Sequence, residues 1–192
     1  IPDEGDVAAA AEKLRLSRLA DAARRVKNNA IAAGRNDGTG KSPGEGDPGR
    51  HIGLSDGPST VFFRNMNRGK KSIVVDLKDA GQREQLLKLC ETADVFVESF
   101  RPGVVDRLGV GYEAVRARNP RIVYCSISAF GQTGPYSGRP ADELALEAES
   151  GLLTAEVGGD GKPAMPAIPA ADVLAGLQGL SAVLMALLRR HQ

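Results

Sequence analysis

The sequence predicts an α/β domain, a Rossmann-like parallel sheet with crossover helices. Between residues 72 and 127, short runs rich in β-branched residues alternate with helical patterns in the order strand, helix, strand, helix, strand. Successive parallel strands need a crossover between them, so this order is typical of a parallel sheet. The 192 residues suffice for one domain with a sizeable core, and 42% apolar with 26% charged residues is ordinary for a globular protein.

The first third of the chain gives weaker signals. Residues 7–33 are rich in alanine, with leucines in a loose helical pattern, so a helix is expected there. Glycine and proline crowd residues 34–60, which we expect to be loop. We therefore divide the chain into a divergent or flexible N-terminal segment, residues 1–45, and an α/β portion, residues 46–192.

From residue 72 onward the pattern sharpens. The predicted strands are rich in Val and Ile, and turn residues such as Pro102-Gly103 follow them. The helices carry apolar residues at helical spacing, and Asn119-Pro120 ends the second of them. The expected strands are 72–77, 94–100 and 121–127. The expected helices are 81–93, 104–118 with an interruption near residues 109–111, 142–153 and 171–191.

Composition and charge disfavour two classes of partner. The formal net charge is +1, aromatic residues make up 4% and tryptophan is absent, so we expect no nucleic acid as a partner. No apolar run approaches the roughly 20 residues of a membrane span, so we also expect no membrane. The chain begins with Ile1 and ends after an apolar helix pattern, which leads us to expect a fragment of a longer protein.

The cysteines and histidines form no reactive group in the sequence. Cys90 falls in a predicted helix and Cys125 in a predicted strand, and both are most simply buried thiols of a reducing compartment. We therefore expect a cytoplasmic protein. His51 lies in a loop and His191 near the end of the chain, so neither is placed as a catalytic base, and no metal site is expected.

Arginines gather where the second predicted strand gives way to a helix. Residues 99–103 (Ser-Phe-Arg-Pro-Gly) end the strand, and Arg101 and Arg107 flank the first helical turn. Ligands bind at the carboxyl ends of parallel strands, and helix N-termini favour anions. These arginines therefore indicate a phosphate-bearing ligand, with surface charges or a pair with Asp106 as the other interpretation.

A second basic group surrounds the first predicted strand. Arg68, Lys70 and Lys71 lie on the turn before it, and Lys78 follows at its far end. These cations either hold a nucleotide phosphate or form a solvated basic turn. The sequence alone leaves both interpretations open.

A loop rich in glycine and proline follows the third strand, at residues 130–135 (Phe-Gly-Gln-Thr-Gly-Pro). Its glycines permit close approach of the backbone to a ligand. The loop lacks both the P-loop lysine and the Rossmann glycine spacing. It is therefore either a structural turn or a wall of a ligand site.

Carboxylates occupy the C-terminal third. Asp172 stands at the start of the last helix, where aspartate is a preferred N-cap, although a carboxylate can also act as a nucleophile. Asp142, Glu143, Glu147 and Glu149 form an acidic patch. We interpret the patch as a solvated helix face, with acid/base catalysis as the alternative.

Taken together, these segments resemble the family III CoA-transferases, the CaiB/BaiF group that includes formyl-CoA transferase, carnitine CoA-transferase and α-methylacyl-CoA racemase. The resemblance runs from about residue 46 to the C-terminus, and the phrases follow one another in the family's order and spacing. The phrases that carry it are NRGKKSIVVDLK (67–78), ADVFVESFRPG (93–103), DRLG (106–109), NPRIVYCSIS (119–128), FGQTGPY (130–136) and ADVLAG (171–176).

The resemblance implies an enzyme that moves CoA from an acyl-CoA donor to a carboxylic acid acceptor. It assigns the family's nucleophilic aspartate, which forms an aspartyl intermediate, to Asp172. Coenzyme A or acyl-CoA is then the substrate, with no tightly bound cofactor. Ser99 stands where the family commonly has Asn, and Ser128 stands where some members have Lys. The positions that match the family's CoA contacts are Lys78, Ser99, Phe100, Arg107, Leu108 and Ser128.

The resemblance further implies an incomplete large domain and, in the full-length protein, an interlocked homodimer. Racemases of the family carry a His in the segment equivalent to residues 139–143, where this chain has Asp142-Glu143, which favours the transferase branch. The alternatives are an acyl-CoA racemase or isomerase, and a truncated CoA-binding remnant without turnover.

Overall fold

The computed structural model describes residues 31–33, 48–55, 57, 59–155, 158–159, 161–163 and 168–190. It is a mixed α/β structure with parallel strand pairing, which confirms the predicted fold class. The described part holds four short strands. They are β1 (Ile31–Ala33), β2 (Lys71–Ile73), β3 (Val95–Glu98) and β4 (Val123–Ser126).

Both strand pairs are parallel, and the alternation of strands and helices predicts the second of them, β3 with β4. β1 pairs with β2, and β3 pairs with β4 with Val95 opposite Val123. The carboxyl ends of β3 and β4 therefore lie at one edge, where Glu98 is opposite Ser126. The predicted site residues that follow these two strands become spatial neighbours in this way.

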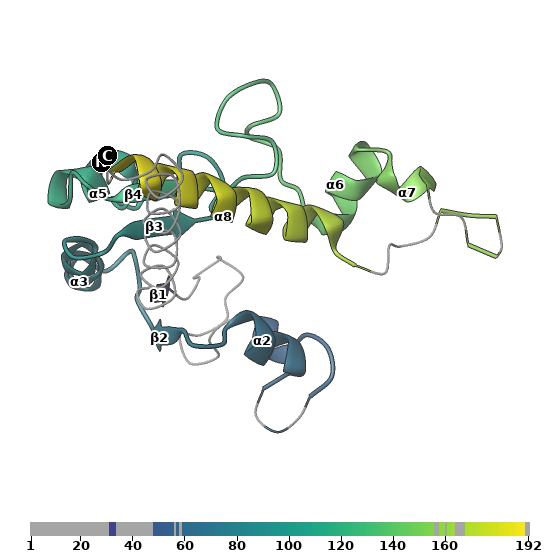
Figure 1. Ribbon diagram of the computed structural model, residues 1–192, viewed down its shortest axis with the longest axis horizontal. Helices are drawn as coiled ribbons and strands as arrows, with labels where there is room; N and C mark the ends of the chain where they lie inside the picture. Colours follow the sequence, from purple (N-terminus) through teal and green to yellow (C-terminus); the bar gives the residue numbers. More distant parts are fainter. Residues whose placement is uncertain are drawn as a thin grey trace, which may run out of the picture.

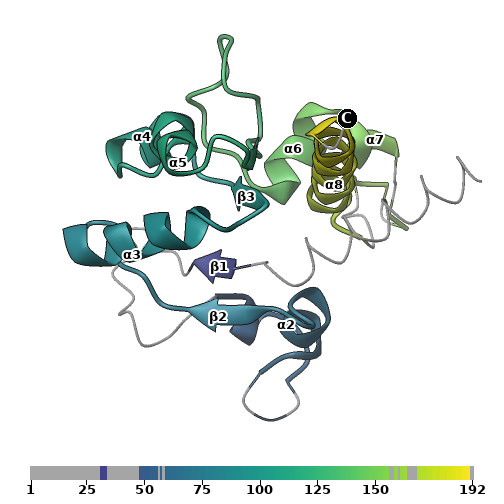
Figure 2. The same cartoon turned by 60° about the vertical axis from the view of Figure 1, so that its left-hand side comes forward.

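Helices flank the strands and extend beyond them. The described helices are the 3-10 helix η1 (Pro48–His51) and the α-helices α2 (Val61–Met66), α3 (Ala80–Cys90), α4 (Val104–Arg107), α5 (Tyr112–Arg118), α6 (Glu143–Glu149), α7 (Leu152–Ala155) and α8 (Ala170–Arg190). α3 contacts α5, and α8 runs along β4 to reach α6 (Figures 1 and 2). The N-terminal turn of α8 is thereby placed beside α6.

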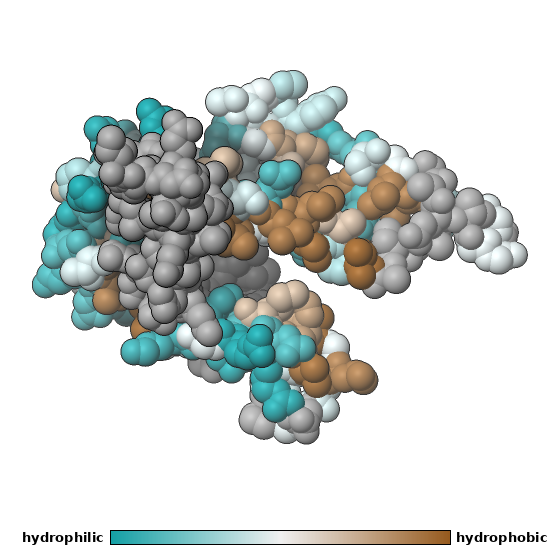
Figure 3. Space-filling model, in the orientation of Figure 1, coloured by the Kyte–Doolittle hydropathy of each residue, from teal (hydrophilic) through white to brown (hydrophobic). Residues whose placement is uncertain are grey.

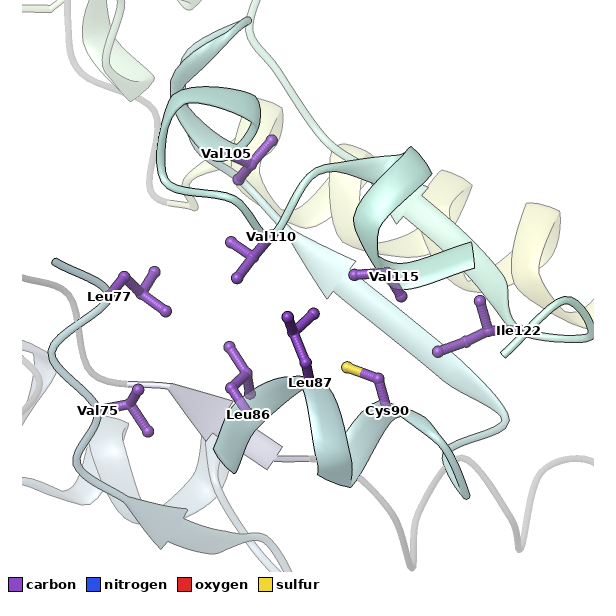
Figure 4. Close-up of a cluster of buried hydrophobic side chains, with 9 residues drawn as sticks. All are labelled: Val75, Leu77, Leu86, Leu87, Cys90, Val105, Val110, Val115 and Ile122. Carbon is purple, nitrogen blue, oxygen red and sulfur yellow. The ribbon is translucent and has the colours of Figure 1, made fainter. Parts of the chain in front are cut away.

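One cluster of nine buried side chains forms the main core (Figure 4). α3 contributes Leu86, Leu87 and Cys90 to it. Phe100 and Leu108 pack against this cluster, so the core fixes two of the predicted site residues. The nine residues are Val75, Leu77, Leu86, Leu87, Cys90, Val105, Val110, Val115 and Ile122.

Short polar side chains start three of the helices. Thr60 caps α2, Asp79 caps α3 and Asp142 caps α6, each accepting the backbone N–H of the residue three positions later. The predicted helix 142–153 is divided into α6 and α7 at Gly151, whose φ of +81° favours glycine. α2 was not predicted, although Thr60 is a typical N-cap signal.

The prediction for the N-terminal region is partly wrong. A helix was expected over residues 7–33, but 31–33 form β1, and the remainder of that range lies outside the described residues. Pairing with β2 gives the backbone of β1 its hydrogen bonds, and this tertiary pairing outweighs the helix propensity of alanine. The expected loop 34–60 contains the short helix η1 in its described part.

α8 corrects the expectation that no apolar run approaches a membrane span. It has 21 residues and a mean hydropathy of 1.8 in its most apolar window, so among the described residues it has the length and composition of a span. A helix lying on the core of a soluble domain meets the same test. Val183 and Leu187 of α8 are buried against β3 and β4, whereas Leu174 and Leu177 are exposed. Figure 3 shows apolar surface along the helix where Figure 1 draws α8.

Candidate active site

A cavity of about 630 Å³ opens at the carboxyl ends of β3 and β4, beside the first turn of α8. Small-molecule sites commonly enclose about 300–1,000 Å³. The cavity wall includes four of the seven residues that the sequence predicts for the site. These are Ser99, Phe100, Ser128 and Asp172.

Two glutamates of α6 bind the N-terminus of α8 across the cavity wall. Glu143 accepts the backbone N–H groups of Ala171 at 2.8 Å and of Asp172 at 2.6 Å. Glu147, 3% exposed, accepts the N–H of Ala170 at 3.1 Å. A helix leaves its first N–H groups without intrahelical partners, and here carboxylates from another helix satisfy three of them.

This arrangement corrects two interpretations. α8 begins at Ala170, so Asp172 lies within the first turn and is not the N-cap that its position suggested. The acidic patch is not a solvated helix face, because Glu143 and Glu147 cap α8 and Asp142 caps α6. The Asp172 side chain is therefore not needed to satisfy the helix end.

The environment of Asp172 raises the pKa of its carboxyl group. Partial burial is the main cause and the Glu143 carboxylate is the second. Burial also opposes ionisation of Glu143, but the N–H groups of Ala171 and Asp172 outweigh it and lower the pKa of Glu143. The two shifts therefore have opposite directions: the pKa of Glu143 is lowered and the pKa of Asp172 is raised.

Hydrogen bonds of two side chains, Glu98 and Gln132, order the strand ends of the cavity. Glu98, 7% exposed at the end of β3, accepts the backbone N–H of Phe100 at 2.8 Å. Gln132 donates to the hydroxyls of Ser126 at 2.7 Å and Ser128 at 3.4 Å. The Glu98 bond fixes the turn after β3, and the Gln132 bonds join the predicted glycine-containing loop to β4.

That loop reaches the cavity through side chains rather than through its glycines. Phe130 and Arg139 line the cavity, whereas Gly131 and Gly134 do not. The Arg139 guanidinium lies over the rings of Phe130 and Tyr136, at 5.4 and 4.8 Å from their centroids. Glu149 of α6 pairs with Arg139 at 2.5 Å, which ties the loop to the helix that caps α8.

Three predicted CoA contacts, Lys78, Arg107 and Leu108, lie outside the cavity wall. Arg107 folds back over the turn after β3, its Nη1 atom 3.4 Å from where a side chain on Gly103 would begin. Leu108 and Phe100 pack on the same core cluster. Phe100 therefore lines the cavity and shares a core cluster with Leu108.

The basic turn before β2 lies away from Lys78. Arg68, Lys70 and Lys71 are exposed and precede or begin β2, which ends at Ile73 and is shorter than the predicted strand 72–77. Lys78 lies five residues beyond the strand, in the turn before α3. This arrangement agrees with the interpretation of a solvated turn.

Of the described cysteines and histidines, Cys90, Cys125 and His51, none lines the cavity. Both thiols are free; Cys90 is buried, with a pKa raised to about 11 by burial, and Cys125 is half-buried. The described residues hold no group of side chains that could bind a metal ion. His51 is exposed at the end of η1, and His191 lies outside the described residues.

Comparison with known proteins places these features in one family. The model of CoA-transferase family III matches residues 41–192. The acetyl-CoA:oxalate CoA-transferase of Acetobacter aceti is 47% identical over 63% of this chain and 31% of its own length. The succinyl-CoA:glutarate CoA-transferase of Mus musculus is 38% identical over 78% of this chain and 35% of its own.

Solved structures agree with this assignment. Rv3272 from Mycobacterium tuberculosis superposes with a TM-score of 0.70 at 37% identity, over 84% of this chain and 42% of its own. A CAIB/BAIF family protein from Brucella suis gives a TM-score of 0.71 at 32% identity, over the same shares. The chain spans about a third of the length of the curated relatives that it matches. By family match, sequence identity and fold, the chain belongs to CoA-transferase family III.

Proposed function

We propose that this chain carries the nucleophile and part of the CoA site of an acyl-CoA transferase. In this proposal CoA moves from an acyl-CoA donor to a carboxylic acid acceptor through an aspartyl intermediate on Asp172. The observation that carries it is that Asp172 lines the cavity while Glu143 and Glu147 cap its helix in its place. Such a carboxylate is available for covalent chemistry.

The chemistry needs no group beyond the substrates. A carboxylate oxygen of Asp172 attacks the thioester carbonyl and the C–S bond breaks. The CoA thiolate leaves, and the acyl group and Asp172 form a mixed anhydride. The thiolate then attacks the aspartyl carbonyl, which releases the donor acid and leaves an aspartyl-CoA thioester. The acceptor carboxylate attacks this thioester and the thiolate attacks the acceptor's carbonyl, so that Asp172 is restored and a new acyl-CoA forms.

The two groups of predicted residues suit the two ends of CoA. Lys78 and Arg107 are cations outside the cavity and suit phosphates. Phe100 lines the cavity and packs against the core cluster on which Leu108 also packs, which supports a ligand path between the two groups. The thioester end then enters the cavity beside Asp172.

The racemase alternative needs a second base. Among the described residues that line the cavity, none is a histidine. The carboxylates Glu143 and Glu147 are engaged by backbone N–H groups of α8. The geometry therefore favours the transferase. Homodimer formation and a cytoplasmic location remain predictions.

Intact-mass spectrometry with hydroxylamine trapping tests the proposal. The chain is incubated with a panel of acyl-CoA donors, which includes acetyl-CoA, succinyl-CoA and formyl-CoA because relatives are named for them. We expect an adduct on Asp172 that D172A abolishes and E149Q retains, since Glu149 lies outside the cavity wall. Oxalate and glutarate serve as the first acceptors.

Each outcome separates the candidates. An adduct mapped to Asp172 supports CoA transfer and identifies the donor. An adduct on another residue, or one that persists in D172A, contradicts the assigned nucleophile. CoA binding without any adduct favours the remnant without turnover or the racemase.

A further inference from the structure

Arg83 of α3 links the two chain segments that carry the predicted contacts outside the cavity. Its Nη1 atom donates to the carbonyl oxygen of Leu77 at 3.3 Å. Its Cδ and Nε atoms lie 3.2 and 3.3 Å from where a side chain on Gly109 would begin. Leu77 directly precedes Lys78, and Gly109 directly follows Leu108, so one arginine contacts a neighbour of each residue.

Two properties of glycine allow the contact between Gly109 and Arg83. Its φ of +73° is in the left-handed region, and a Cβ atom there would crowd the Arg83 side chain. The backbone after α4 can therefore approach Arg83 closely. This approach holds Leu108 against the core cluster that also contains Leu77.

α3 fixes the turn around Lys78 by further bonds. The backbone N–H of Asp76 donates to Gln82 at 2.8 Å, and the N–H of Lys78 donates to the Asp76 carboxylate at 2.9 Å. Asp79 caps the helix at Gln82. The first turn of α3 thus orders residues 76–79, and Arg83, one residue further, extends that order to the segment after α4.

We infer that Arg83 is a positioning residue for CoA binding. It holds the Lys78 turn and the Arg107–Leu108 segment side by side without itself lining the cavity. The inference rests on the proposed function, because Lys78, Arg107 and Leu108 are assigned to CoA there. Arg83 acts before chemistry, on the affinity for the nucleotide end, and leaves the reaction at Asp172 unchanged.

Titration of the 192-residue chain with CoA tests this role. Replacing Arg83 with glutamine removes the long stem and the bond to Leu77, and we expect the Kd for CoA to rise about 2- to 10-fold, as expected for one lost hydrogen bond. R83K keeps a stem and a donor and should restore affinity to within about 2-fold. R118Q is the matched control, since Arg118 pairs with Glu84 beside Arg83 but contacts neither segment.

Adduct formation at saturating acyl-CoA gives a second readout, which we expect to be equal in R83Q and the unaltered chain. Melting temperatures of the variants show whether a change in Kd reflects a loss of folding. A Kd shift shared by R118Q, or a loss of adduct as well as affinity, overturns the inference. So does an unchanged Kd in R83Q. If the unaltered chain binds CoA but forms no adduct, the transfer function fails while the Kd comparison still tests Arg83. If the unaltered chain binds no CoA, both the transfer function and the positioning role of Arg83 fail.

Discussion

The carboxylate of Glu143 accepts the backbone N–H of Asp172 at 2.6 Å, although the two residues are 29 positions apart. Glu143 thereby fixes the position of the proposed nucleophile through its main chain. The same charge raises the pKa of the Asp172 side chain, after the larger effect of burial. Position and proton affinity of Asp172 therefore depend on one neighbouring residue.

Replacing Glu143 with glutamine should shift the pH dependence of adduct formation. Attack requires ionised Asp172, so the rate should rise with pH as it passes the raised pKa of this group. E143Q removes the charge that raises the pKa, so the rising limb should move to lower pH. Its plateau should also fall, because an amide offers one acceptor oxygen for two N–H groups.

The measurement is the initial rate of adduct formation from about pH 4 to about pH 8, across the range where carboxyl groups with raised pKa values titrate. E149Q serves as the control, since it removes a carboxylate of α6 that accepts no N–H of α8 in the described structure. If the rate of adduct formation rises over the same pH range in E143Q as in the unaltered chain, the Glu143 charge does not raise the pKa of Asp172.

Replacing Asp172 with asparagine should stabilise the fold at neutral pH. A carboxyl whose pKa is raised on folding contributes stability below its unfolded pKa, and this contribution is lost as pH rises through the folded pKa. At pH 7 the ionised group therefore carries a cost that D172N removes. Asp172 is exposed in part, so solvent screening keeps the gain below about 1 kcal/mol.

Thermal unfolding of D172N and the unaltered chain at two pH values measures this effect. We expect a higher Tm for D172N at pH near 7, by at most about 2–4 °C, and a smaller difference below about pH 3, where Asp is protonated in both states. If the Tm gain of D172N instead grows towards acid pH, the pKa of Asp172 is not raised on folding.

The buried Glu147 should matter more to stability than the exposed Glu149. E147A removes a buried carboxylate and leaves the part-buried N–H of Ala170 without its acceptor, which costs about 1–3 kcal/mol. E149A removes a surface pair with Arg139 and should cost about 0–1 kcal/mol. Urea unfolding at constant pH compares them, and equal midpoints would show that capping by Glu147 contributes little.

The alternation of strands and helices could be predicted because each element has its own local sequence pattern. Leu86, Leu87 and Cys90 show the inward face of α3 directly in the sequence. Parallel pairing of β3 and β4 follows from the connection between them. The family resemblance then placed Ser99, Phe100, Ser128 and Asp172, and the structure brings these four to one cavity.

The residues that hold the site in place could not be predicted from the sequence, because their contacts join elements that are distant in the chain. Nothing local to Glu143 and Glu147 distinguishes a solvated face from a cap on another helix, although their four-residue spacing places both on one face. The role of Arg83 depends on a glycine in a later turn. β1 was missed because its partner strand lies 40 residues further along the chain.

Gly111 makes the turn between α4 and α5 sterically demanding. Its φ of −70° suits any residue, so backbone strain plays no part. A Cβ there would lie 1.8 Å from the Oδ1 atom of Asp106, and 3.2 Å from its Cα, so the side chain and the backbone of Asp106 would both have to move. We expect G111A to destabilise the fold by about 1–3 kcal/mol through overpacking.

A double variant separates the two parts of this contact. In G111A/D106A the carboxylate clash disappears but the 3.2 Å contact with the Asp106 backbone remains, so stability should return only in part. G138A is the matched control, because nothing lies within 4 Å of a Cβ on Gly138 and its φ is not in the left-handed region. Because this turn follows directly after Arg107 and Leu108, G111A should also weaken CoA binding. If G111A unfolds in urea at the same midpoint as G138A, then Asp106 yields without cost and the turn does not fix this part of the site.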